Sequence, residues 1–494
     1  MRALINTVKA KWIYIITMCW LIVPFLIFIL GWLRLYYAIP IAAAVVWSFY
    51  LFIKKSKPIE LPKLNRRTAI IASVSLLGIV LWVFASGIGG YMYQNDDFLY
   101  RNAILIDLIK HPWPVIFSPA ELKGSEPFAM VYYFGFFLPS ALVGKLFGVK
   151  AAAAAMWLWS FIGVSCLWLL LITKIKKISI LPLLFIALFG GMDIIGCLLY
   201  AKPLSFTEHI QWWGKPWQFS AMSTQFFWVF NQSLPAWILL ALLMLQKERH
   251  SLVFLMGLLL FFAPLPFTGA LPFFIIRLLP PLKQLKTGFN AAYFKGIFTP
   301  QNLLGGGFIG IISFLFYSTN LAGNNYRFYQ FKQGDVLRFV IFTLLEFGIL
   351  AILLFKENRK NVDYWLIIAV LLFSPFVRVG PMLDFCMRFS IPALFFLLVL
   401  SMESCLNLKL SSLIKQRKNW LPLVRSIALI AVLCIGSVTS GLELSRSIVR
   451  TAQGENQPKY ELGTVLNSRF TLIPNFIGKK EGTIFFDFLA NTKP

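Results

Sequence analysis

Acidic residues are scarce in this sequence. It has 20 aspartates and glutamates against 46 lysines and arginines in 494 residues, which gives a formal net charge of +26 at pH 7. Only 13% of its residues are charged, whereas 59% are hydrophobic. A soluble chain of this length needs more polar residues to cover its surface. The composition therefore excludes a soluble globular protein, and two acids that stand side by side call for an explanation.

Residues that build disulfides and metal centres are also few. The chain has three histidines, without a spacing typical of zinc ligands, and six cysteines, without a CxxC pair. All the cysteines lie in or beside apolar runs, so we expect them to pack as small apolar side chains. They are Cys19, Cys166, Cys197, Cys386, Cys405 and Cys434. The sequence thus predicts neither a disulfide framework nor a resident metal.

Apolar runs of membrane-spanning length recur along the whole chain. A transmembrane helix needs roughly 17–25 apolar residues, and the runs 12–30, 35–53 and 69–88 are the first three of this kind. We therefore expect an all-α polytopic membrane protein with about 13 transmembrane helices. No small-residue cleavage site follows the first run, so it is predicted to be an anchor and not a removed signal peptide.

Basic clusters set the expected orientation. Residues 54–67 and 409–418 are rich in lysine and arginine and are predicted to be cytoplasmic. Loops 89–128 and 201–228 and the tail from 441 then lie on the external face. The remaining positive charge suits anionic lipid headgroups, so the lipid bilayer is the expected partner and nucleic acid is not.

One region breaks a simple count of crossings. Full spans at 129–147 and 151–173 would leave the basic cluster 174–177 outside, against the positive-inside rule. Pro139 and Gly144 interrupt the first of these runs and favour a broken or partial span. We therefore place the cluster inside. The expected parts of the chain are a two-span N-terminal addition with its basic loop (1–68), a transmembrane catalytic module (69–440) and an external tail (441–494).

Two adjacent carboxylates, Asp96 and Asp97, follow the third apolar run at the membrane edge. Asp97 is placed to cap a helix that begins near Phe98, with Arg101 one turn further on. A carboxylate beside the membrane is partly desolvated, which makes it a better acceptor of a hydroxyl proton. Helix capping and general-base or metal-binding chemistry are both open, and one aspartate can cap while the other reacts.

The segment 98–110 is predicted to be a short helix that lies along the membrane interface. Its apolar side would carry Ile104 and Leu108, and its polar side Asp107 and Lys110. Arg101 interrupts the apolar side, so we expect it to turn toward the two carboxylates.

A second group of candidates combines aromatic rings with hydrogen-bonding side chains after the run 178–200. Tryptophans near the end of a span are commonly interfacial anchors. Rings beside amide, carboxylate and imidazole groups also suit a sugar, which has apolar faces and a polar edge. The candidate substrate-binding residues here are Glu208, His209, Trp212, Trp213 and Gln232.

A third group lies between two apolar runs near residue 380. Arg378, Asp384 and Arg388 are costly at the membrane edge unless they pair with each other or bind a ligand. Arginine is a natural partner of phosphate. An Asp384–Arg388 ion pair one helical turn apart is the structural alternative.

Four segments resemble a known superfamily. The runs NDDFLYRNAILIDLIKHPWPV, HIQWW, FFWVFNQSLPAW and LDFCMRFSIPAL are similar to a bacterial polytopic branch of the GT-C superfamily of integral-membrane glycosyltransferases. The resemblance covers residues 90–480 and leaves the first two spans as an addition. It implies transfer of a sugar from a polyprenyl-phosphate donor, with Asp96 or Asp97 as the base, and does not fix which one.

We therefore expect an inverting glycosyltransferase of the bacterial cytoplasmic membrane whose active site faces outward. An Asp96 or Asp97 carboxylate takes the proton from an acceptor hydroxyl on a glycan, lipid or protein. Arg378, Arg388 and Arg101 stabilise the leaving lipid phosphate. No cofactor is required, although a divalent metal that bridges the phosphate and the carboxylate is compatible with this mechanism.

Two other classes remain open. One is a transporter or flippase for a lipid-linked glycan, and the other is a non-catalytic membrane subunit of polysaccharide assembly. A transporter needs charged groups along a path across the whole bilayer. Most candidates here are predicted to lie on one side, which favours chemistry at the membrane surface.

Overall fold

The computed structural model is mostly helical. It describes residues 7–122, 126–202, 209–246, 248–280, 288–322, 326–379, 384–408, 420–469 and 471–492. Within these ranges, eight helices are long and apolar enough to cross a membrane. They are α1 (Trp12–Trp32), α2 (Leu35–Lys55), α3 (Arg66–Ala85), α7 (Val149–Ile175), α8 with α9 (Leu181–Leu199), α10 (Met222–Leu245), α15 with α16 (Asp335–Asn358) and α21 (Leu421–Ala452).

A ninth span results if two helices bent by 48° count as one, namely α13 (Ala291–Ile297) and the segment Gln301–Tyr317, which ends in α14 (Gly307–Tyr317). These eight or nine helices confirm a polytopic membrane protein. The larger expected number of about 13 crossings stays a prediction. Shorter apolar helices lie among the spans: α6 (Leu138–Phe147), α11 (Leu252–Phe262), α12 (Pro264–Leu278), α17 (Val362–Phe373) and α19 (Ile391–Asn407).

The run 129–147 is broken, as its proline and glycines predict. Its first residues form strand β4 (Phe128–Met130), and only α6 is α-helical. α6 stops at Gly148, whose φ of 84° and ψ of 175° suit glycine alone, and α7 starts at the next residue. The two helices pack closely against each other. This segment is therefore too short for a full span.

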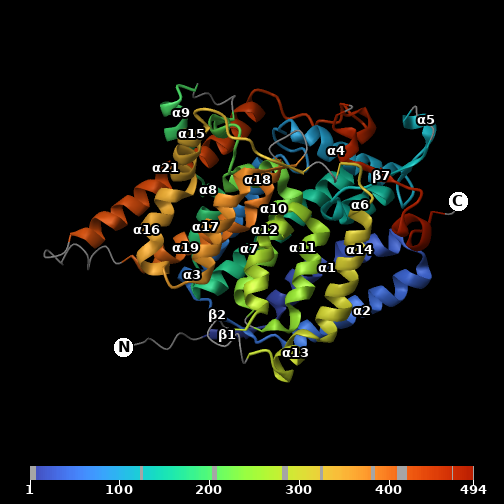
Figure 1. The fold of residues 1–494 in the computed structure, drawn as a ribbon, viewed down its shortest axis with the longest axis horizontal. Coiled ribbons are helices and arrows are strands. Elements are labelled where there is room, and N and C mark those ends of the chain that lie inside the picture. The colour runs from blue at the N-terminus through green and yellow to red at the C-terminus, as the bar shows by residue number, and fades with distance from the viewer. Residues whose placement is uncertain are drawn as a thin grey trace.

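Segments far apart in the sequence meet at two opposite ends of the helical bundle (Figure 1). At one end, β1 (Thr7–Ala10) pairs with β2 (Ile59–Pro62) in the basic loop. At the other end, β3 (Ile116–Phe117), β4 and β7 (Ile477–Lys479) form one sheet. The first long loop and the C-terminal tail thus share one end of the bundle, whereas their orientation in a membrane stays a prediction.

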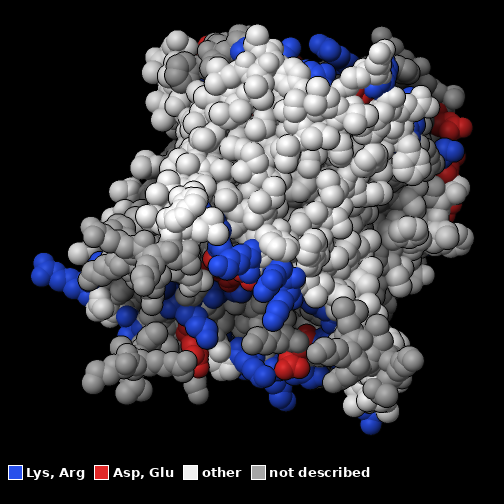
Figure 2. All heavy atoms as spheres, turned by 60° about the vertical axis from the view of Figure 1, so that its left-hand side comes forward, with Lys and Arg blue, Asp and Glu red and all other residues white. Residues whose placement is uncertain are grey.

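Charge follows these two ends. Lysines and arginines gather toward the lower end and along the upper rim of the face in Figure 2, and the wide area between them is almost uncharged. Lys174 bonds to Glu403 near the end of α19 at 2.8 Å, which places the basic cluster after α7 beside the segment that leads to residue 409. An uncharged belt between charged ends is the surface that a bilayer requires.

The N-terminal helix α1 is built into the core. The ring of Phe28 lies 5.1 Å from that of Phe316 on α14 and 6.2 Å from that of Phe485 in the tail. Trp20 stacks on Trp159 of α7 at 5.4 Å. Aromatic pairs at these distances stabilise the folded state by more than the buried area of their rings accounts for. The first span therefore helps to hold the C-terminal tail at its end of the bundle.

Candidate functional site

The loop with the two aspartates leads into α4 (Asp97–Lys110), as predicted. The prediction that Asp97 caps this helix is wrong: Asp97 is its first residue, and Asp96 occupies the N-cap position without a capping hydrogen bond from its side chain. Instead, Asn95 Oδ1 accepts the backbone N–H of Asp97 at 3.1 Å. The Asp96 carboxylate is 82% exposed and pairs with Lys459 Nζ of the tail at 2.7 Å. Helix capping therefore does not account for the presence of the two aspartates.

Asp97 faces Arg101, which confirms the expected turn of this arginine toward the carboxylates. Arg101 Nη2 lies 3.1 Å from Asp97 Oδ2 across one helical turn. The Asp97 side chain is 33% exposed, whereas that of Arg101 is 4% exposed. Arg101 therefore holds the carboxylate from the protein side, while one-third of the Asp97 side chain is exposed to solvent.

Two tyrosines link Arg101 to a third predicted site residue, Arg388. Arg101 Nη1 donates to the Tyr132 hydroxyl at 2.6 Å, and the Tyr132 ring lies 3.7 Å from the Tyr133 ring. The Tyr133 hydroxyl accepts from Arg388 Nη1 at 2.8 Å. We call Asp97, Arg101, Tyr132, Tyr133 and Arg388 the arginine–tyrosine cluster. It brings together three of the predicted site residues from opposite ends of the sequence.

A kink in α10 completes this region. Val229 has non-helical dihedral angles (φ −133°, ψ 37°), and the preceding carbonyl of Trp228 accepts from Arg101 Nη2 at 3.3 Å. After the kink, Asn231 Nδ2 donates to the Tyr133 carbonyl at 3.4 Å. Gln232 is fully buried, and neither of its amide atoms has a partner among the described residues. Non-helical backbone inside a helix, with a carbonyl that bonds a side chain, is often found at functional sites.

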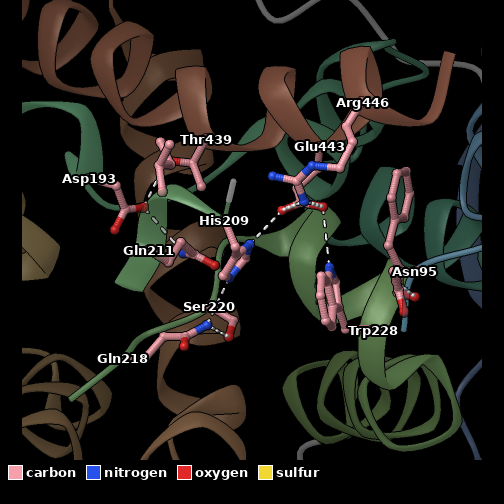
Figure 3. A network of polar contacts seen from close by, with 12 residues as sticks. Asn95, Asp193, His209, Gln211, Gln218, Ser220, Trp228, Thr439, Glu443 and Arg446 are labelled. Atoms are coloured by element: carbon pink, nitrogen blue, oxygen red, sulfur yellow. Dashed lines mark hydrogen bonds and ion pairs between the residues drawn. The ribbon is translucent and has the colours of Figure 1, made fainter. Parts of the chain in front are cut away.

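A second network is centred on His209 (Figure 3). Trp228 links it to the cluster, because its carbonyl accepts from Arg101 and its indole N–H donates to Glu443. His209 Nδ1 lies 2.7 Å from Glu443 Oε1, and Gln218 Nε2 lies 3.2 Å from His209 Nε2. Because the Gln218 amide nitrogen can only donate, His209 Nε2 accepts and Nδ1 carries the proton. Glu443 also accepts from Trp228 Nε1 at 3.2 Å and pairs with Arg446 Nη1 at 3.0 Å.

The loop that carries His209, Gln211 and Trp213 also contacts a buried carboxylate. Asp193, at the start of α9 (Asp193–Leu199), is fully buried. Its Oδ1 accepts from Trp213 Nε1 at 2.9 Å, and its Oδ2 from Gln211 Nε2 at 3.2 Å and Thr439 Oγ1 at 2.8 Å. Trp213 is 1% exposed. Trp213 therefore anchors the loop and has no surface for a sugar ring in this conformation.

Trp212 differs from its neighbour. It is 47% exposed, and Lys215 Nζ lies 4.2 Å from the centre of its ring. The His209 ring packs against it at 5.6 Å. Among the tryptophans of this loop that were predicted to bind substrate, Trp212 is the one whose ring a ligand can reach. Glu208 lies outside the described residues.

The third group of candidates is divided. Arg388 belongs to the arginine–tyrosine cluster, whereas Arg378 lies in β6 (Val377–Val379) with its guanidinium 4.7 Å from the centre of the Tyr329 ring. Asp384 begins α18 (Asp384–Phe389), and its side chain lies outside the described part of the chain. The predicted Asp384–Arg388 pair is therefore untested.

Several site residues escaped the sequence analysis. Tyr132 and Tyr133 stand in a run that reads as an apolar span. Glu443 and Arg446 lie where α21 continues past Gly441, and both are about 5% exposed. The sequence does indicate this pair, because two opposite charges three residues apart in a long apolar helix are expected to have a specific role. The link from Asp96 to Lys459 carried no such signal, because it depends on where the tail folds.

The described residues contain no group of three or more histidine, cysteine, aspartate or glutamate side chains that is arranged to hold a metal ion. No family model, no curated protein and no solved structure matches this chain. The functional argument therefore depends on the geometry of the site.

Proposed function

We propose that this chain is a membrane glycosyltransferase of the GT-C type. It moves a sugar from a polyprenyl-phosphate donor to an acceptor hydroxyl of a glycan, lipid or protein. The enzyme acts at the external face of the bacterial cytoplasmic membrane, with Asp97 as the general base.

One observation carries the proposal, namely the arginine–tyrosine cluster. A carboxylate that is one-third exposed and a half-buried arginine, Arg388, share one set of contacts through Arg101 and two tyrosines. A reaction that deprotonates a hydroxyl and releases a lipid phosphate needs a base and a cation near each other. Asp96 is the weaker candidate, because it is mostly exposed and pairs with a lysine of the tail.

The proposed reaction is a single displacement. The acceptor oxygen attacks the anomeric carbon of the donor sugar, and the bond between that carbon and the phosphate oxygen breaks. Asp97 takes the hydroxyl proton, and the electron pair of the broken bond stays on the phosphate. Arg388 stabilises this negative charge, because a guanidinium matches two phosphate oxygens. Arg101 is buried and keeps Asp97 in position.

The remaining acceleration comes from positioning. A general base typically contributes about 10²–10⁴-fold, so alignment of the two substrates supplies a large part of the rest. In this proposal the exposed ring of Trp212 binds the sugar, and His209, which packs against it, supports that ring from the protein side. His209 is held by Glu443 and Gln218, which fixes its ring plane.

Binding of labelled polyprenyl phosphate tests the donor side without knowledge of the sugar. We expect Arg388→Ala to weaken binding by about tenfold or more, because a hydrogen bond to a charged group contributes roughly 1.5–3 kcal/mol. Arg388→Lys should recover only part of the affinity, since lysine lacks the planar fork. The purified protein in detergent, titrated with the labelled lipid, gives the dissociation constants.

Arg359→Ala is the matched control, because this exposed arginine directly follows α16 (Ile349–Asn358), away from the cluster. It should bind the lipid as the wild type does. Normal binding by Arg388→Ala, or an equal loss in Arg359→Ala, would contradict the proposed role of Arg388.

A further inference from the structure

Two arginines face each other across a short ribbon of two strands. β5 (Tyr326–Phe328) pairs with β6 in antiparallel register, and Arg327 stands directly opposite Arg378. Residues directly opposite in an antiparallel pair project from the same face, and like charges at such positions destabilise the pair. In the described part of the chain, Arg327 is exposed and has no ion pair. An anion bound between the two guanidinium groups would relieve this repulsion.

Further cations surround the ribbon. Lys332 is exposed, and Arg338 is half-buried with its guanidinium 5.1 Å from the centre of the Tyr200 ring. The nearby acid, Asp335, accepts from the Tyr329 hydroxyl at 2.7 Å and from the Lys332 backbone at 2.8 Å. Its carboxylate is thus engaged by the loop itself. Excess positive charge with aromatic support suits a phosphate group.

The ribbon stands on an aromatic base. Trp217 packs against Tyr329 at 5.3 Å and Phe339 at 5.4 Å, and Phe331 lies 5.4 Å from Phe376. These rings fix the strand that carries Arg378, whose own guanidinium covers Tyr329. Arg378 is therefore held in place before a ligand arrives, which lowers the entropic cost of binding.

Exposed apolar side chains continue from the cations onto α15 (Asp335–Thr343), at the upper end of the bundle in Figure 1. Phe328 is 79% exposed, and Val336 and Leu337 are 65% and 67% exposed. α15 begins the apolar stretch Asp335–Asn358, which is long enough to cross a membrane. A ligand with an anionic head and an apolar chain would meet the arginines and this apolar surface together.

We infer that Arg327 and Arg378 bind the phosphate of a lipid, with the lipid chain along the exposed side of α15. The strand that carries Arg378 packs against α18, which carries Arg388, but the inference does not depend on the proposed glycosyltransferase activity. Free phosphate shares the chemistry of the head, so the test separates the two sources.

The test measures the thermal unfolding midpoint of the purified full-length protein in detergent. Short-chain phosphatidylglycerol, short-chain phosphatidylcholine and inorganic phosphate are added separately. We expect phosphatidylglycerol to raise the midpoint of the wild type more than zwitterionic phosphatidylcholine does. Arg327→Gln should unfold at a higher temperature than the wild type without lipid, because the repulsion is relieved, and should lose most of the shift with phosphatidylglycerol.

Lys360→Gln is the matched control, since it removes one exposed charge at the other end of the apolar stretch. It should keep the full shift. A shift with phosphatidylglycerol but not with inorganic phosphate supports a lipid, and a shift with both supports the phosphate site itself. No shift in the wild type, or an undiminished shift in Arg327→Gln, would overturn the inference.

Discussion

Two carboxylates at the same end of the bundle, Asp193 and Asp97, are built into the protein differently. Asp193 is fully buried, and both of its oxygens accept hydrogen bonds from side chains of the loop and of α21. Asp97 is one-third exposed and is held on its protein side by Arg101. Their sequence settings resemble each other, because each is an acid beside an apolar run.

This difference indicates which carboxylate stabilises the fold and which one a substrate can reach. A buried carboxylate with several donors can fix three segments to one another, but a substrate cannot reach it. A general base must come within hydrogen-bonding distance of the proton that it takes, which requires access. By this criterion the Asp193 and Glu443 networks form the scaffold, and the arginine–tyrosine cluster is the part that we propose to be reactive.

The largest stability effect is expected from the scaffold. Glu443→Ala should lower the free energy of unfolding by about 3–5 kcal/mol, because it leaves Arg446 and His209 buried without their carboxylate. Glu403→Ala is the matched control. Its pair with Lys174 is about one-third exposed on both sides, so the loss should be up to about 1 kcal/mol.

Unfolding of both variants in detergent, compared with the wild type, sharpens the contrast between scaffold and surface. Equal losses in Glu443→Ala and Glu403→Ala would mean that burial does not determine how much these ion pairs contribute to the free energy of unfolding. The assignment of the Glu443 network to the scaffold would then be wrong.

Asp107 on α4 gives a pH-dependent effect. The sequence places it on the polar face of an interfacial helix, but the tail covers it: it is 1% exposed and accepts from the Val465 backbone at 2.8 Å and from Thr464 Oγ1 at 3.1 Å. Burial raises the pKa of Asp107 from 3.8 to about 6, although these hydrogen bonds partly oppose the shift. The folded state therefore holds this proton more tightly than the unfolded state does.

For an acid whose pKa is raised on folding, this contribution to stability is greatest below pH 3.8 and is lost as the pH rises to about 6. The loss amounts to about 3 kcal/mol. Asp107→Asn keeps an acceptor but cannot ionise, so its stability relative to the wild type should be higher at pH 7.5 than at pH 5. Unfolding midpoints at the two pH values check this, and a difference that does not change with pH would show that Asp107 remains ionised.

Much of the fold follows from local patterns in the sequence. Apolar length predicted the early spans, and Pro139 with the neighbouring glycines predicted the break before α7. The Asp97–Arg101 contact was also predictable, because it joins two residues one helical turn apart. In each case the information lies within a few residues of the feature.

The rest of the site depends on contacts between distant segments. Periodicity placed Asp107 on a polar face because the sequence gives no sign that the tail returns to cover it. Trp212 and Trp213 are adjacent and chemically alike, yet only packing against Asp193 decides that one is buried and the other exposed. The link between Arg101 and Arg388 needs two tyrosines from a third segment.

Transfer of a labelled sugar by Asp97→Asn and Asp96→Asn tests the central claim most directly. Each variant would be assayed in membranes with the polyprenyl-phosphate sugar that the wild type uses. Asparagine keeps the size of aspartate and is a good residue at a helix start, so both variants should insert normally. We predict that Asp97→Asn loses about 10²–10⁴-fold of the transfer rate and that Asp96→Asn keeps most of it. Full activity in Asp97→Asn, or a loss confined to Asp96→Asn, would contradict the account.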